Sequence, residues 1–126
     1  MSRVLALLLL AVLLSAQTAA AGVADDEREA RVTGVCVGSG SATLRLKAED
    51  GRLEVRATLN RTGVGSWRVV LVHESRVDWR GASRTTLARR SFEVRRLLRD
   101  LPGTDTVTAR AWGPGGRSCR ASATVA

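Results

Sequence analysis

Residues 41–60, SATLRLKAEDGRLEVRATLN, decide the fold class of this chain. Apolar and charged side chains alternate along both halves of the stretch, which is the period of a β-strand with one buried face. Asp50-Gly51 separates the two halves, and this dipeptide favours a two-residue type I′ turn because both central positions need a positive φ. The stretch therefore predicts an antiparallel hairpin with one face in a hydrophobic core.

A two-residue turn also fixes which residues of this hairpin face each other. Apolar positions of the two strands then oppose one another on the core side, while acids and bases meet on the solvent side. Arg45 and Arg56 form a like-charge pair on the solvent side, which the diagonal neighbour Glu54 can partly relieve. The turn and the alternation thus agree on one register.

Further short strands follow this hairpin. Residues 67–73 are apolar on both phases, as expected for a central strand. We expect this strand to pair with the next one through a three-residue loop, which would set Leu71 opposite Trp79. Residues 85–89 are weakly strand-like, and residues 92–94 indicate another short strand.

The last hairpin joins residues 106–112 to a final strand that begins near Cys119. Alternation places Ala111 and Cys119 on the same inward face, and they oppose each other only if the connection has an odd number of residues. We therefore predict a bulge or a five-residue connection, Gly113–Arg117, rather than a four-residue loop.

The end of the chain resembles a known fold. Leu101-Pro102-Gly103-Thr104, followed by an alternating strand, a glycine-rich hairpin and a last strand, resembles the E–F loop and the F and G strands of fibronectin type III and related immunoglobulin-like domains. This resemblance covers the last quarter of the chain. The whole chain is also similar to small arginine-rich secreted proteins of GC-rich bacteria. We expect an all-β, immunoglobulin-like antiparallel β-sandwich of about seven strands.

The N-terminus reads as a secretory signal. Arg3 precedes an apolar run over residues 4–16, and Ala19 and Ala21 fit an A-x-A cleavage site. An uncleaved membrane anchor, with the apolar stretch extended to Ala24, stays open as an alternative. The expected organisation is a signal helix at residues 1–21, a polar lead-in at 22–30 and one sandwich domain at 31–126.

Two cysteines, Cys36 and Cys119, lie near opposite ends of the expected domain. Secretion exposes them to an oxidising compartment, so we expect them to form a disulfide. On the chain-entropy model such a long loop stabilises the fold by roughly 4 to 5 kcal/mol at most. Two cysteines and the single histidine, His73, do not complete a tetrahedral metal site, so we expect neither metal nor cofactor.

The chain is strongly basic, with a formal net charge of +8, and Lys47 is its only lysine. Such a protein is attracted to anionic surfaces in a salt-dependent way. Arginines are dense between residues 76 and 99, and they form an anion-attracting edge if several lie together. The alternative is a solvated edge that discourages strand pairing between molecules. The binding candidates from this segment are Arg89, Arg90, Arg95 and Arg96.

Trp112 is the second binding candidate. Strand phase turns Trp67 and Trp79 inward but sets Trp112 outward, beside Arg110. An exposed tryptophan beside arginines can stack on a sugar or anchor a protein contact. Burial of this ring by strand twist is the alternative.

Catalytic motifs are missing from the sequence. His73 has no recognisable nucleophile or acid partner, and the acidic residues are interpreted as scattered on turns or paired with arginines. We therefore expect a secreted, monomeric, non-enzymatic binding module for a protein or an anionic envelope polymer, with neither nucleic acid nor membrane as partner. The alternatives are an inhibitor or accessory subunit of a secreted enzyme, and a hydrolase that uses His73 as its base.

Overall fold

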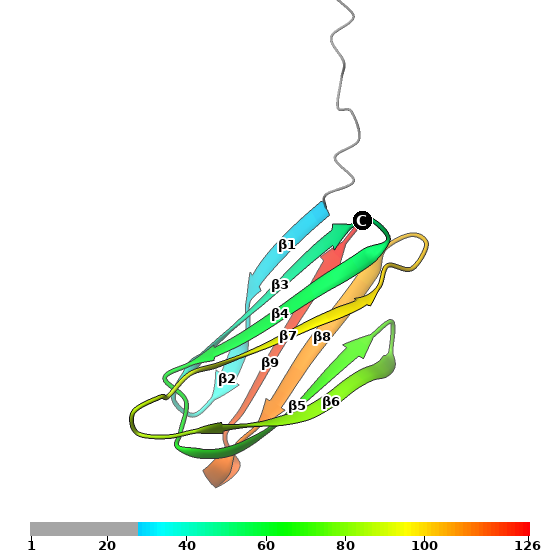
Figure 1. Ribbon diagram of the computed structural model, residues 1–126. Coiled ribbons are helices and arrows are strands. Elements are labelled where there is room, and N and C mark those ends of the chain that lie inside the picture. Colours follow the sequence, from blue (N-terminus) through cyan, green and yellow to red (C-terminus); the bar gives the residue numbers. More distant parts are fainter. Residues whose placement is uncertain (1–27) are drawn as a thin grey trace, which may run out of the picture.

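The computed structural model describes residues 28–126, so the predicted signal helix lies outside the described part. Two antiparallel sheets pack face to face and confirm the expected β-sandwich (Figure 1). One sheet has the order β1-β3-β4-β7 and the other β2-β9-β8-β5-β6. The nine strands are β1 (Arg28–Thr33), β2 (Val35–Val37), β3 (Ser41–Glu49), β4 (Arg52–Asn60), β5 (Gly65–His73), β6 (Arg76–Thr85), β7 (Phe92–Arg99), β8 (Asp105–Trp112) and β9 (Ser118–Val125).

Strands β1 and β2 account for the difference from the expected seven. β1 begins at Arg28, inside the segment expected to be a polar lead-in, because Ala30 and Val32 alternate with charged residues and pack against the core. The chain then crosses at Gly34 from one sheet to the other. A Cβ at Gly34 would lie 2.5 Å from the carbonyl oxygen of Arg120, so this crossing requires glycine.

The hairpin β3–β4 has the predicted register throughout. Asp50 and Gly51 have φ values of 52° and 75°, as the type I′ turn requires. Arg45 lies opposite Arg56, and the alternate residues of both strands are buried between the sheets. The local turn signal was therefore sufficient to define this unit.

Strand β5 is central, as predicted, because it pairs with both β6 and β8. Leu71 lies opposite Trp79 as predicted, but the three-residue loop was wrong. The two residues Glu74 and Ser75 join the strands, and a register shift after Leu71 accommodates Asp78 as an extra residue in β6. The weak strand expected at residues 85–89 was wrong, since only Thr85 is extended and it ends β6. The Thr85 hydroxyl, which donates to the carbonyl of Gly63 at 2.6 Å, ties this end to the loop before β5.

The hairpin β8–β9 confirms the five-residue connection. Ala111 lies opposite Cys119, and residues 113–117 join the strands through a short 3-10 turn, Pro114–Gly116. Cys119 forms the expected disulfide with Cys36 of the adjacent strand β2. The bond therefore fastens the three-residue edge strand β2 to the body of the sheet.

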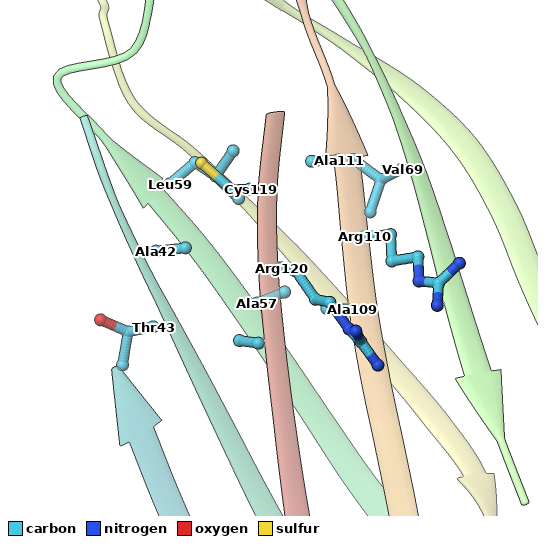
Figure 2. A pocket seen from close by; sticks show the side chains of 11 residues that line it. Ala42, Thr43, Ala57, Leu59, Val69, Ala109, Arg110, Ala111, Cys119 and Arg120 are labelled. Atoms are coloured by element: carbon cyan, nitrogen blue, oxygen red, sulfur yellow. The ribbon is translucent and has the colours of Figure 1, made fainter. Parts of the chain in front are cut away.

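Small side chains bring the two sheets close together. Alanines from four strands line a gap of about 10 Å³ between the sheets, which is too small for a ligand (Figure 2). Trp67, fully buried, packs against Gly113 and Phe92, and its indole N–H donates to the Gly63 carbonyl at 3.0 Å. Residues 28–126 include no helix long and apolar enough to cross a membrane.

Candidate functional site

The outer, solvent-exposed face of the five-stranded sheet brings together arginines from four strands. In β8 the side chains of Val107, Ala109 and Ala111 are buried, so Arg110 and Trp112 project from the opposite side. We call this surface the arginine face. Its exposed members are Arg68 on β5, Arg80 on β6, Arg110 and Trp112 on β8, and Arg120 on β9.

Strand pairing aligns three of these arginines in one row. Arg110 lies directly opposite Arg120 on one side and opposite Val70 on the other. Val70 in turn lies opposite Arg80, so the row crosses β9, β8, β5 and β6. With neighbouring strands about 4.8 Å apart, the row spans roughly 14 Å.

The arginines of this face form no direct ion pair within the described residues, although Glu74 lines the same hollow as Arg110 and Arg120. None of Arg68, Arg80, Arg110 and Arg120 forms an ion pair with an acidic group in residues 28–126. Like charges placed directly opposite each other on adjacent strands destabilise a sheet. The Arg110–Arg120 pair therefore carries a repulsion that no direct ion pair relieves among the described residues.

The opposite sheet has the same kind of pair and does offset it. Arg45 lies opposite Arg56, but Glu29 approaches Arg45 at 2.6 Å. Glu54 and Glu93 lie 3.5 and 3.4 Å from Arg56, which confirms the relief expected from Glu54. Arg31 and Arg95 extend this pair into a row, opposite Arg45 and Arg56, and three of its four arginines form ion pairs with glutamates. Arg110 and Arg120 form no such ion pair in residues 28–126.

Trp112 is exposed on this face, on the side that strand phase predicts, with 39% of its surface accessible. It lies opposite Arg68, whose guanidinium carbon is 6.0 Å from the centre of the indole ring. A shallow hollow of about 260 Å³ lies beside the ring. It is lined by Arg68, Val69, Val70, Arg80, Gly81 and Trp112. The arginine face is therefore hollowed beside Trp112, whose indole ring forms one side of the hollow.

The predicted candidates on β7 are engaged within the protein. Arg95 forms an ion pair with Glu54 at 3.1 Å on the outer face of the four-stranded sheet. Arg96 projects from the edge of the same sheet, and its guanidinium carbon lies 4.5 Å from the centre of the Trp79 ring. This contact covers the half-buried Trp79 at the side of the sandwich.

The candidates in the loop before β7 are separated from the arginine face. The Arg90 guanidinium donates to the carbonyl of Thr62 at 3.2 Å, and the Arg90 carbonyl accepts from the Thr62 amide and hydroxyl. Arg89 is exposed in the turn that follows β6, where its backbone bonds to Thr86. Of the predicted residues, only Arg110 and Trp112 lie together on one surface.

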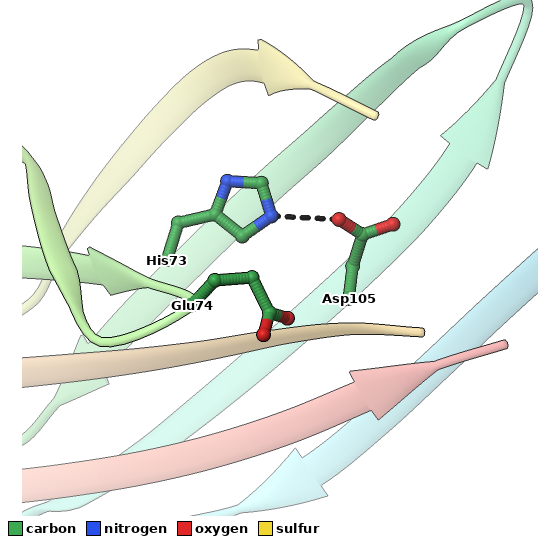
Figure 3. Close-up of side chains that lie close together, drawn as sticks. All are labelled: His73, Glu74 and Asp105. Carbon is green, nitrogen blue, oxygen red and sulfur yellow. Dashed lines mark hydrogen bonds and ion pairs between the residues drawn. The ribbon is translucent and has the colours of Figure 1, made fainter. Parts of the chain in front are cut away.

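A second cluster, which the sequence did not predict, surrounds His73. Nε2 of His73 lies 2.7 Å from Oδ1 of Asp105 (Figure 3). Nδ1 of His73 lies 3.3 Å from Oδ2 of Asp78. His73 is 5% exposed and Asp105 is fully buried. The expectation that the acids are scattered was wrong for Asp105, because the pairing of β5 with β8 brings it to His73.

Asp100 extends this cluster to the loop between β7 and β8. The hydrogen bond to Asp105 raises the pKa of Asp100, and desolvation adds to this effect against the opposing ion pair with Arg28. Burial raises the pKa of Asp105, but hydrogen bonds from Asp100, His73 and the Leu101 amide outweigh it and lower that pKa. Oδ1 of Asp100 and Oδ2 of Asp105 are buried and have no other hydrogen-bond partner among the described residues.

The contacts of the His73 cluster indicate a structural role. Both ring nitrogens face carboxylates, so neither is left to accept a proton from a nucleophile among the described residues. Glu74 lies close enough to His73 and Asp105 to form a three-ligand group, but its carboxylate already accepts the Thr106 amide. The cluster ties the ends of β5 and β8 together.

Comparison with known proteins adds no further assignment. No protein-family model, curated protein or solved structure matches this chain. The arginine face and the His73 cluster are therefore the two features from which a function is inferred.

Proposed function

We propose that the protein is a small secreted, non-enzymatic binding module whose arginine face binds an anionic polymer of the cell envelope. The observation that carries this proposal is the pair of Arg110 and Arg120, which forms no ion pair among the described residues. A ligand with negative groups removes the repulsion between them, and arginine forks suit carboxylate, sulfate or phosphate. The ligand thus supplies the charge that Glu29, Glu54 and Glu93 supply on the other sheet.

An extended ligand fits the spacing of this face better than a small ion. The row from Arg80 to Arg120 crosses four strands, or roughly 14 Å, and one small anion reaches only a neighbouring pair of side chains. Repeated negative groups along a polymer can engage the whole row. The solvent-exposed face also leaves a long chain free to extend beyond the sheet.

The disulfide and the fold support the proposed secretion and the proposed binding role. The disulfide is typical of an oxidising compartment, in line with the predicted signal peptide.

We further propose kinship with fibronectin type III and immunoglobulin-like domains, because β7, the loop over residues 100–104, β8 and β9 follow one another as strands E, F and G do. A binding role also accounts for a buried His73 that has no free ring nitrogen.

Affinity measurements with the purified, oxidised protein test this proposal. The probes are polygalacturonate and inorganic polyphosphate, each at about 50 and about 500 mM salt. The variant is Arg110→Ser/Arg120→Ser, and the matched control is Arg89→Ser/Arg99→Ser, which removes the same charge from exposed positions outside the face.

We expect the wild-type protein to bind at low salt and to lose affinity at high salt. The variant on the arginine face should lose at least about tenfold in affinity for a bound polymer, and the control less than about threefold. Equal losses in both variants would indicate attraction by net charge alone and would contradict the proposal. Binding of neither polymer by the wild-type protein would also contradict it.

A further inference from the structure

The hollow on the arginine face combines charge with apolar surface. Arg68 and Trp112 lie opposite each other in one row, and Arg80 and Val70 in the next. The hollow that these four residues line has a volume of about 260 Å³. That is below the range of about 300 to 1,000 Å³ of pockets for drug-sized ligands, so it suits one small unit of a larger ligand.

The apolar part of the hollow discriminates between kinds of anion. Half-buried Val70 lies between the strands that carry Trp112 and Arg80, and the Trp112 ring is 39% exposed beside it. A phosphate group gains nothing from an indole ring or a valine, because every face of the group is strongly hydrated. The C–H face of a sugar ring is apolar and flat, so it can pack on the indole while its substituents stay in water.

We propose that this hollow is a subsite for one anionic sugar unit, so that the polymer bound is an acidic polysaccharide. The proposal rests on the function proposed above and narrows its ligand class. Trp112 stacks on the sugar ring, Val70 contacts its edge, and Arg68 or Arg80 binds the carboxylate or sulfate that the unit carries. Trp112 is then a specificity-determining residue, whereas Arg110 and Arg120 provide attraction to any polyanion.

Trp112→Ala tests this inference against two polyanions that differ in sugar content. Oligogalacturonate carries one carboxylate on each sugar, and inorganic polyphosphate has no sugar. We expect Trp112→Ala to weaken oligogalacturonate binding by at least about tenfold and polyphosphate binding by less than about threefold. Trp112→Phe, which keeps an aromatic ring, should recover most of the lost affinity.

A second readout does not depend on a variant. Saturation-transfer NMR on the wild-type protein should show transfer to the ring C–H protons of bound oligogalacturonate, because these protons face Trp112. Equal effects of Trp112→Ala on both polymers, or no transfer to the ring protons, would overturn the sugar subsite. In that result the polyanion-binding function still stands if Arg110→Ser/Arg120→Ser weakens both ligands, and it fails with the subsite if that variant weakens neither.

Discussion

Arg110 and Arg120 lie directly opposite each other on β8 and β9, in a ladder whose next outward pair consists of hydroxyl groups. That neighbouring pair, Thr108 and Ser122, has its two side-chain oxygens 2.9 Å apart, within hydrogen-bond distance. A threonine or serine at each arginine position would extend this ladder without repulsion. The presence of two facing arginines is therefore a cost to folding that a binding role explains.

Replacing this pair should stabilise the protein. We expect Arg110→Thr/Arg120→Ser to raise the free energy of unfolding by about 0.5 to 1 kcal/mol at low salt, because it removes a like-charge pair and permits a hydroxyl pair. Urea denaturation at about 50 and about 500 mM salt measures this gain, which should shrink at high salt. A loss of stability at low salt would argue against a repulsion between the two arginines.

Removing Asp105 should destabilise the fold strongly. Asp105→Ala leaves the His73 ring and the Leu101 amide without their shared acceptor in a buried site. We expect a loss of about 3 to 5 kcal/mol in the free energy of unfolding. The control is Asp78→Ala, which removes the longer and more exposed contact of His73 and should cost less than about 1 kcal/mol. Similar losses in the two variants would contradict the assignment of Asp105 as the centre of the cluster.

Asp100 should make stability depend on pH in a defined direction. Its pKa is raised in the folded protein, so its neutral form stabilises the fold below the ordinary value of 3.8. This contribution is lost as the pH rises through the folded value. Asp100→Asn keeps a donor toward Asp105 at every pH, so the variant should gain stability relative to the wild-type protein between about pH 3 and about pH 7. Thermal unfolding of both proteins across this range is the measurement, and a constant difference would show that Asp100 does not titrate in this way.

The disulfide should matter most for the first part of the domain. Strand β2 has three residues, pairs with β9, and exposes Val35 and Val37, so Cys36 provides its main anchor. Cys36→Ser/Cys119→Ser should lower the free energy of unfolding by up to roughly 4 to 5 kcal/mol. Hydrogen exchange should show faster exchange in β2 than in the hairpin β3–β4. Unchanged exchange in β2 would show that strand pairing alone holds it.

Local signals made much of this fold predictable. Asp50-Gly51 and the inward phase of Ala111 and Cys119 fixed two hairpins, because a turn and an alternation together leave one register. The register of the second hairpin already implies that Arg110 opposes Arg120. The density of arginines along residues 76–99 does not reveal this pair, because its members come from two neighbouring strands outside that segment.

Turn and alternation signals do not predict contacts between strands that are distant in sequence. No turn joins β5 to β8, so nothing local places Val70 beside Arg110 or His73 beside Asp105. β1 was missed for a related reason, since its two small apolar residues reveal a strand only when β3 lies beside them. The contact of Arg96 with the Trp79 ring joins different sheets, so no local signal indicates it either.

Residue-resolved NMR titration of the protein with oligogalacturonate tests the central claim most directly. If the arginine face binds the polymer, amide shifts should concentrate on the outward residues of β5, β6, β8 and β9, with Arg110, Trp112 and Arg120 among the largest, and should weaken at about 500 mM salt. Shifts concentrated instead in the loop over residues 86–91 or in the connection 113–117 would contradict the claim. The latter result would favour recognition through a rigid loop, as in an inhibitor or accessory subunit of a secreted enzyme.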